Sequence, residues 1–203
     1  MKSAAVSPHS EVPNKKRSRI RRVAKRASYL KEDIYALVDD LKLGHIGFVQ
    51  DNQVIVIPMT VWRVGEHLYL HVANKSRLQR LLESGQEVCV SFAESAEWVF
   101  AKSAYHHSAN YRSAVLFCRG ERVTEPFEFD TAFAGIINQL EPDRWDEVRS
   151  PNELERKATA LMRLHILDGS FKSRTGGPNE EPEDMSLPVW HGTRPVCPFH
   201  HEK

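Results

Sequence analysis

The feature that most constrains the fold is a series of short β-type segments separated by turn residues. His45 to Gln50 and Val54 to Arg63 are rich in β-branched and aromatic residues, and the Asp51-Asn52-Gln53 run between them is typical of a hairpin turn. In His67 to Val72, leucine and valine alternate with histidine and tyrosine, which predicts a third strand with two different faces. The chain is therefore expected to build an antiparallel sheet.

Further strand-like segments and several helical segments follow along the chain. The strand pattern returns in Glu87 to Ala93, Trp98 to Ala104 and Arg112 to Val123, and Arg163 to Ser170 is a candidate last strand. Helical spacing of apolar residues predicts helices from Ser28 to Gly44, around Leu78 to Leu82, from Phe129 to Leu140 and from Glu153 to Met162. About six strands in sequential hairpins, with helices inserted between some of them, favour an antiparallel barrel of the mainly β or α+β class.

The domain organisation follows from length and local composition. A chain of 203 residues with 41% hydrophobic residues can bury one good core and is short for two. We expect a barrel domain at 28–174, a basic, flexible N-terminal arm at 1–27 and an extended C-terminal arm at 175–203, where Gly, Pro, Asn and Glu are frequent.

Charge and hydropathy exclude several classes of protein. The net charge of +1 creates no overall field that would attract nucleic acid, and no run approaches the ~20 apolar residues of a membrane span. The basic N-terminal run has no apolar stretch of the kind found in secretory signals. We therefore expect a cytoplasmic protein without membrane association, in which the basic arm is solvated. Nucleic-acid binding through this arm is a less favoured, non-catalytic alternative.

The cysteines do not form a spaced framework of the kind that small secreted domains use. Cys89 and Cys118 lie within strand-like runs, and Cys197 lies in a Pro-rich tail. Cys197 with His200 and His201 is a weak set of metal ligands, and the His106-His107 pair lacks a third ligand. The sequence therefore predicts no metal site.

The clearest candidate for an anion site is the stretch from His71 to Arg77. It combines the end of a strand, a tight turn and the start of a helix that carries Lys75, Ser76 and Arg77. Free backbone N–H groups at a helix start, two cations and a hydroxyl can together hold a phosphate group. The alternative is a capped turn in solvent, which this local pattern does not exclude.

Two other segments are unusual. Pro58, Met59 and Thr60 interrupt a strand, and a proline there leaves an unpaired edge on which a planar ring could rest, although a plain core strand is the alternative. The run from Ser103 to Ser113 is polar and aromatic between two strand segments. It is either a hydrogen-bonded corner or subunit contact, or a lining of a ligand site.

Taken in order, seven segments resemble the FMN-binding split-barrel family related to pyridoxamine 5'-phosphate oxidase, in particular its nitroimidazole-resistance branch. The resemblance extends from Tyr29 to about Gly192. The segments are Gly44 to Val49, Val56 to Arg63, Leu68 to His71, Lys75 to Arg77, Ser103 to Ser113, Lys172 to Gly176 and Leu187 to Trp190.

The resemblance implies a six-stranded antiparallel split β-barrel with peripheral helices and a homodimer with FMN at the subunit interface. The backbone of Pro58, Met59, Thr60 and Val61 would face the flavin ring. The resemblance implies further cofactor contacts from these residues: His71 near the flavin, Lys75, Ser76 and Arg77 at its phosphate, and Lys172, Arg174 and Trp190 from the late segments of the partner chain.

Several functions are compatible with these features. The first is an FMN-dependent oxidoreductase acting on a small conjugated or nitroaromatic compound; the flavin would carry the redox chemistry, and no catalytic side chain is identified. The second is a binding protein of the same fold that holds flavin or haem, with the His106-His107 loop or the His-rich tail as iron ligand. Pyridoxamine-phosphate oxidase activity ranks lower, because the substrate contacts of that enzyme are not recognisable near the C-terminus.

Overall fold

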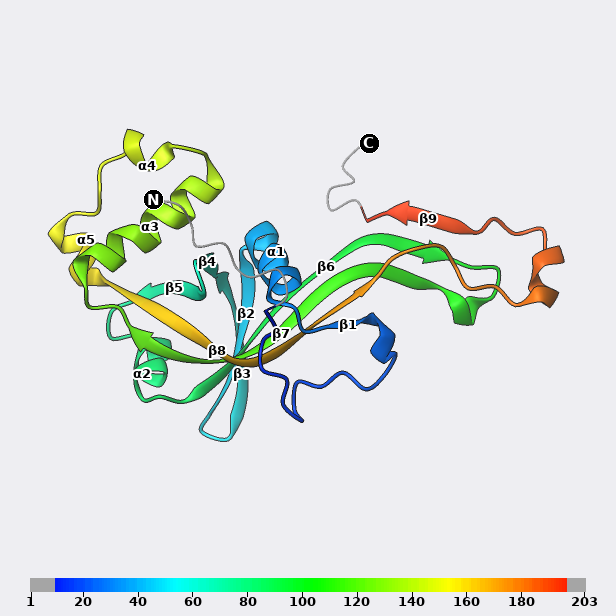
Figure 1. Ribbon diagram of the computed structural model, residues 1–203, viewed down its shortest axis with the longest axis horizontal. Coiled ribbons are helices and arrows are strands. Elements are labelled where there is room, and N and C mark those ends of the chain that lie inside the picture. Colours follow the sequence, from blue (N-terminus) through cyan, green and yellow to red (C-terminus); the bar gives the residue numbers. More distant parts are fainter. Residues whose placement is uncertain (1–9, 197–203) are drawn as a thin grey trace.

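The computed structural model describes residues 10–196, whose strands form one antiparallel sheet that curves into an open barrel (Figure 1). The strands are β1 (Ala27–Ser28), β2 (Leu43–Gln50), β3 (Gln53–Thr60), β4 (Trp62–Val64), β5 (His67–Ala73), β6 (Glu87–Phe100), β7 (Ser108–Arg122), β8 (Thr159–Arg174) and β9 (Gly192–Pro195). The helices are α1 (Lys31–Leu41), α2 (Arg77–Glu83), α3 (Pro126–Leu140), α4 (Arg144–Glu147) and α5 (Glu153–Ala158), with 3-10 turns η1 (Ala24–Arg26), η2 (Ala104–His106) and η3 (Pro182–Ser186).

The order of neighbours across the sheet is β3-β2-β6-β7-β8-β5-β4, with β1 added beside β8 and β9 beside β6. All of these pairings are antiparallel. Because β3 and β4 lie at the two ends of this path, the barrel is split. Six strands, β2, β3, β5, β6, β7 and β8, carry the barrel, which confirms the predicted antiparallel split barrel with peripheral helices.

The core lies inside the barrel and under α1. Ile46, Phe92, Leu116, Met162 and Leu164, which come from four different strands, are completely buried. Full burial of such side chains contributes about 1.5–3 kcal/mol each. The alternation of apolar and polar residues in these strands therefore determines which face of the sheet turns inward.

Two predicted strands, Glu87 to Ala93 and Trp98 to Ala104, form the single long strand β6. The irregularity between them is a bulge at Ser95 and Glu97 in the pairing with β7. A bulge bends a strand without ending it. The polar Glu-Ser-Ala-Glu segment between the two predicted strands is thus a bend within one strand.

The first helix ends earlier than Gly44. Its last residue is Leu41, and Lys42 takes the left-handed conformation that closes it, with a φ of 52°. Gly44 instead lies in β2, where an added Cβ would come within 3.0 Å of Val61 and 3.1 Å of Phe92. This glycine is explained by close packing and not by a helix end.

The predicted helix from Glu153 to Met162 is correct only in its first half. Asn152 and Glu155 form a reciprocal capping box at its start, and the helix ends at Ala158. β8 begins at the next residue, and its Leu161 and Met162 are buried on opposite faces. A short apolar run that is buried on both sides cannot be assigned to helix or strand by periodicity alone.

α3 covers the outer face of β4 and β5. Trp62 is fully buried there and donates its indole N–H to the carbonyl of Ala132 over 2.8 Å. Tyr69 packs in the same cluster, and burial together with its hydrogen bond to Glu128 raises the pKa of Tyr69 to about 12. Within residues 10–196, no helix is long and apolar enough to cross a membrane.

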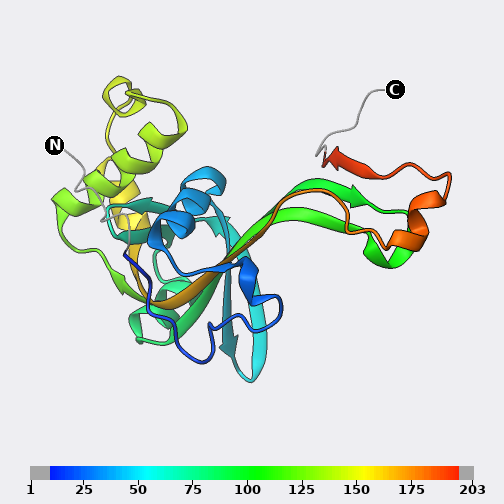
Figure 2. The same ribbon diagram turned by 45° about the vertical axis from the view of Figure 1, so that its right-hand side comes forward.

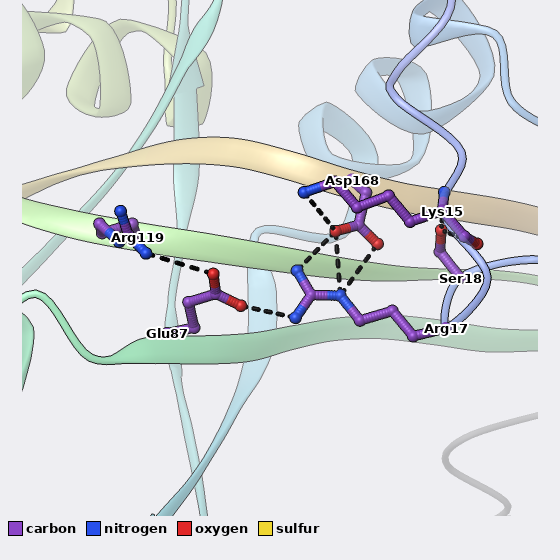
Figure 3. A network of polar contacts seen from close by, with 6 residues as sticks. All are labelled: Lys15, Arg17, Ser18, Glu87, Arg119 and Asp168. Atoms are coloured by element: carbon purple, nitrogen blue, oxygen red, sulfur yellow. Dashed lines mark hydrogen bonds and ion pairs between the residues drawn. The ribbon is translucent and has the colours of Figure 1, made fainter.

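The N-terminal segment from residue 10 onward packs against the sheet, where the sequence predicts a solvated arm. Val12 is buried, and the Arg17 guanidinium lies between Asp168 of β8 and Glu87 of β6 (Figure 3). Its Nε donates to Asp168 Oδ2 over 3.0 Å, and its plane lies 4.2 Å above the ring of Phe117. A buried carboxylate needs such a partner, so this part of the basic arm is structural.

The most distinctive part of the molecule is an arm that extends away from the barrel in both views (Figures 1 and 2). It consists of residues 95–112, which contain the far ends of β6 and β7, and of residues 175–196, which return along them. β9 closes the arm by pairing with β6 from Glu97 to Phe100. We call these two segments the ribbon.

Candidate functional site

The outer face of β3 is an open, mostly apolar surface. β3 pairs only with β2, so one of its edges is free, and Pro58 lies opposite His45 on this edge strand. A proline is tolerated at a free edge because it needs no ladder hydrogen bond there. Pro58 and Thr60 are exposed, whereas Met59 points toward the core and is partly buried.

Val61 differs from its neighbours. Its side chain is completely buried, and its N–H donates to the carbonyl of Lys42 over 2.8 Å. Among the four residues predicted to face a flavin ring, Pro58 and Thr60 therefore offer side chains to the surface, and the side chain and amide of Val61 are engaged elsewhere.

The predicted phosphate cradle forms the start of α2. Ser76 is the N-cap, and its hydroxyl accepts the N–H of Gln79 over 3.2 Å. Lys75 lies before it in the left-handed region, with a φ of 65°. Lys75 and Arg77 are both exposed, and within residues 10–196 neither makes an ion pair. Two cations beside a helix start thus remain free to bind an anion.

The contact between Arg77 and Phe48 brings this cradle next to the β2–β3 hairpin. The Arg77 guanidinium lies 5.7 Å from the centre of the Phe48 ring, and Phe48 is paired with Ile55 of β3. Ile55 is three residues from Pro58, which is roughly 10 Å along a strand. The phosphate cradle therefore lies beside the β2–β3 hairpin, on the side where Phe48 and Ile55 face the core, whereas Pro58 faces outward.

Arg122 is a residue near the cradle that the sequence analysis missed. It lies at the end of β7, donates to the side chain of Asn74 over 3.3 Å and lies 3.6 Å from Glu83 of α2. Together with Lys157 it borders a cavity of about 560 Å³. No local pattern could indicate this role, because β7 is 48 residues away from Asn74 in the chain.

His71 lies on the outward face of β5. Its ring is exposed and lies 6.1 Å from Trp62 and 5.9 Å from Phe133, centre to centre. Trp62 is two residues beyond the end of β3, so His71 is close to the same surface as Thr60. The structure thus brings together the predicted residues of β3, β5 and α2.

Lys172 and Arg174 lie elsewhere. The cradle is beside the first residue of β8, since Ala73 pairs with Thr159 and the Asn74 N–H bonds to Ala158. At about 3.3 Å per residue, the part of β8 between Thr159 and Lys172 is roughly 40 Å long. Within one chain, a single flavin cannot contact both ends of β8.

Trp190 lies on the ribbon. It is half exposed, its ring is 5.4 Å from that of Phe100, and the Arg194 guanidinium lies 4.6 Å from its centre. None of the cradle residues lies on the ribbon. Lys172, Arg174 and Trp190 could reach a cradle only if it belonged to another molecule.

The Ser103 to Ser113 run is more ordered than a loop. It contains η2, and β7 already begins at Ser108. His106 points its Nε2 toward Glu181 at 3.4 Å, whereas His107 donates its Nδ1–H to the carbonyl of Ser103 over 3.1 Å. Residues 10–196 contain no cluster of three potential metal ligands. Cys197, His200 and His201 lie outside the described residues.

A family model described as pyridoxamine 5'-phosphate oxidase matches residues 31–173. The chain belongs to this family. The match begins with α1 and ends within β8, so it contains β3, β5 and α2 and excludes the returning half of the ribbon. The resemblance stated from the sequence is thereby confirmed. No curated protein matches the chain.

Two solved structures are similar over most of the chain. The flavocytochrome Anf3 from Azotobacter vinelandii is 30% identical, with 91% of this chain and 87% of that chain covered and a TM-score of 0.83. An FAD and haem binding protein from Mycobacterium smegmatis is 28% identical, with 84% of each chain covered and a TM-score of 0.78. Both matches cover more of this chain than the family model does.

A third solved structure is a candidate 5-nitroimidazole antibiotic resistance protein from Bacteroides thetaiotaomicron. It is 16% identical, with 72% of this chain and 85% of that chain covered and a TM-score of 0.60. At this level of identity the match shows a common fold.

Proposed function

We propose that this chain binds FMN on the surface formed by β3 and the start of α2, and that it is an oxidoreductase of small conjugated or nitroaromatic compounds. The observation that carries the proposal is the contact of Arg77 with Phe48, which places two unpaired cations beside the β2–β3 hairpin. The similarity to a flavocytochrome and to an FAD and haem binding protein supports it.

Each part of the surface fits a part of this ligand. Lys75 and Arg77 would neutralise the phosphate group, and the exposed Pro58 and Thr60 would lie against the ring. His71 would stand at the edge of the ring. The bound flavin supplies hydride or electron transfer, and the protein supplies position and a partly dry environment.

We further propose that the active form is a homodimer. Lys172, Arg174 and Trp190 are too far from the cradle of their own chain, so they would contact a flavin held by a second copy. The ribbon supports this arrangement, because Trp98, Val189 and Trp190 each leave half or more of their surface exposed. Tryptophan is enriched at protein interfaces relative to the rest of the surface. We propose a cytoplasmic location, since Cys89 and Cys118 are free thiols.

Replacing Lys75 and Arg77 together with alanine tests the cradle. Two lost charge-assisted contacts would raise the dissociation constant of FMN at least about 100-fold, measured by quenching of flavin fluorescence. Alanine and lysine have the same preference at the positive φ of residue 75, so the backbone should not change. Arg80→Ala, which removes a cation from the exposed side of α2, should change the affinity less than about threefold. Unchanged affinity in the double variant would place the phosphate elsewhere.

Haem binding is a second candidate, and the geometry of His107 favours it. The Nδ1–H of His107 is held by the Ser103 carbonyl, which leaves Nε2 as the ring nitrogen available to a metal, as in many metal-ligating histidines. His107 borders an apolar pocket of about 310 Å³ with Trp98 and Phe100. The donor and the apolar lining fit the edge of a haem.

The two adjacent histidines allow a matched test of haem binding. Titration of the purified protein with haemin should produce a Soret band that His107→Ala abolishes and His106→Ala leaves in place, because the Nε2 of His106 already faces Glu181. Equal spectra in the two variants would exclude His107 as the iron ligand.

A further inference from the structure

A polar groove of about 690 Å³ lies at the far end of β8, away from the phosphate cradle of its own chain. One wall is the segment from Lys25 to Ser28, which pairs with β8 through β1. The opposite wall is the end of β8 and the turn at Gly176 and Gly177. Two segments about 150 residues apart in the chain therefore enclose one groove.

Arg174 is one of the residues that line the groove, and only 7% of its surface is exposed. Its guanidinium donates to the carbonyls of Gly176 and Gly177 over 3.0 and 2.7 Å, and also to the side-chain oxygen of Asn110. All three acceptors are neutral. Burial, together with the nearby charge of Arg26, lowers the pKa of Arg174.

The charges that line the groove do not balance. Lys25, Arg26 and Arg174 contribute three cations, and Asp33 contributes one carboxylate. Within residues 10–196, none of these four side chains takes part in an ion pair. A buried arginine whose charge is not compensated is costly unless an anion accompanies it.

The neutral groups of the groove also suit an oxyanion. Ser28, Ser173 and Thr175 line it with hydroxyls. An added Cβ at Gly176 or Gly177 would meet nothing within 4 Å, so the backbone of this turn is open to the groove. Guanidinium, ammonium and hydroxyl donors together match the oxygens of a phosphate group.

We propose that this groove binds the phosphate group of a small molecule. The three cations exceed the single carboxylate by two charges, which matches a doubly charged anion better than a single carboxylate ligand. The phosphate could belong to a phosphorylated metabolite or to the pyrophosphate of an FAD molecule held by a second copy of the chain. The recognition chemistry is the same in the two cases.

The test is a calorimetric titration of the full chain with inorganic pyrophosphate. The double variant Lys25→Ala/Arg26→Ala should weaken binding at least about tenfold. Lys16→Ala/Arg19→Ala is the matched control, since it removes the same charge from the same N-terminal segment outside the groove, and it should change the affinity less than about twofold. Circular dichroism of both variants checks that the fold is retained.

Two results would overturn the proposal: no pyrophosphate binding by the wild-type chain, or equal weakening by the two double variants, which would indicate general attraction to the basic segment. The source of the phosphate follows from repeating the titration with flavin-free and flavin-loaded protein. Binding to both forms supports a separate phosphorylated ligand. Binding to the flavin-free form alone, with competition by FAD, supports the same groove as the place of the flavin's own pyrophosphate.

Discussion

The barrel and the ribbon of this protein are built from the same strands but are held together differently. In the barrel, Phe92 and Leu116 are completely buried in one large hydrophobic cluster. In the ribbon, Val99 and Ala101 are buried but belong to neither hydrophobic cluster, whereas Trp98 and Trp190 are half exposed. β6 passes through both regions, so one strand has two environments.

Polar contacts take the place of a core in the ribbon. The backbone N–H of Lys102 donates to Glu180 over 3.0 Å, its ammonium group donates to the carbonyl of Val189 over 2.9 Å, and Asn110 donates to Glu97 over 2.6 Å. Such contacts define a conformation but contribute little net stability. The comparison indicates that the barrel contributes most of the stability, and the ribbon is the part that we propose contacts a second copy of the chain.

The largest expected effect comes from removing a core side chain. Phe92→Ala should lower the free energy of unfolding by about 3–5 kcal/mol, because it removes a fully buried ring and leaves a cavity. Denaturant unfolding followed by circular dichroism measures this. A loss below about 1 kcal/mol would mean that the barrel core is not the main source of stability.

Arg17→Ala should have the next largest effect, about 3 kcal/mol at neutral pH, because the completely buried Asp168 would keep only Lys15, at 3.7 Å, as a charged partner. Burial tends to raise the pKa of Asp168, but the hydrogen bonds from Arg17 and Ser18 outweigh it and hold that pKa below its ordinary value.

The sign of the pH dependence follows from this shift. In the wild type, the stability contributed by Asp168 is present above its unfolded pKa of about 3.9 and is lost as the pH falls through the lower folded value. In Arg17→Ala, burial dominates and favours the protonated acid, so the deficit relative to wild type should shrink on acidification. Arg119→Ala, which breaks one exposed contact with Glu87, is the control, and a pH-independent deficit in Arg17→Ala would contradict this account.

Gly169→Ala probes the place where β8 leaves the barrel. An added Cβ would lie 2.6 Å from the side chain of Leu116 and 3.1 Å from the carbonyl oxygen of Val115. Since the second contact is with backbone, we expect a loss of about 1–3 kcal/mol in chemical denaturation. Wild-type stability in this variant would show that the junction can move to accept a methyl group.

Trp190→Ala should change the unfolding free energy least, by about 0.5 kcal/mol, because half of its surface is exposed. Its expected effect is on assembly, with the dissociation constant of the dimer raised at least about tenfold in sedimentation experiments. The control is Leu154→Ala, which removes an exposed apolar side chain from α5, outside the ribbon. A stability loss as large as that of Phe92→Ala would remove the distinction between barrel and ribbon.

The sequence predicted the parts of this structure that local chemistry determines. The hairpin at Asp51 to Gln53 and the cap at Ser76 follow from turn and capping residues, and both are present. The first helix is closed by Lys42, and the sequence analysis had placed its end at Gly44. Gly44 lies in a strand, where close packing against Phe92 leaves no room for a side chain. Local patterns cannot reveal such a contact.

The sequence did not predict contacts between segments that are far apart in the chain. Arg17 and Asp168 are 151 residues apart, and the basic character of the arm suggested solvent and not a buried partner. The position of Arg122 beside Asn74 likewise depends on how β7 crosses the sheet. The predicted residues of β3, β5 and α2 came together because short connections join them, whereas Lys172 and Arg174 lie at the other end of a long strand.

The visible absorption spectrum of the purified chain, before and after added FMN and then with NADH or NADPH under anaerobic conditions, tests the proposed flavin site most directly. The account predicts the bands of bound oxidised flavin and their bleaching by at least one of the two donors. A colourless protein that leaves the spectrum of added FMN unchanged would contradict it.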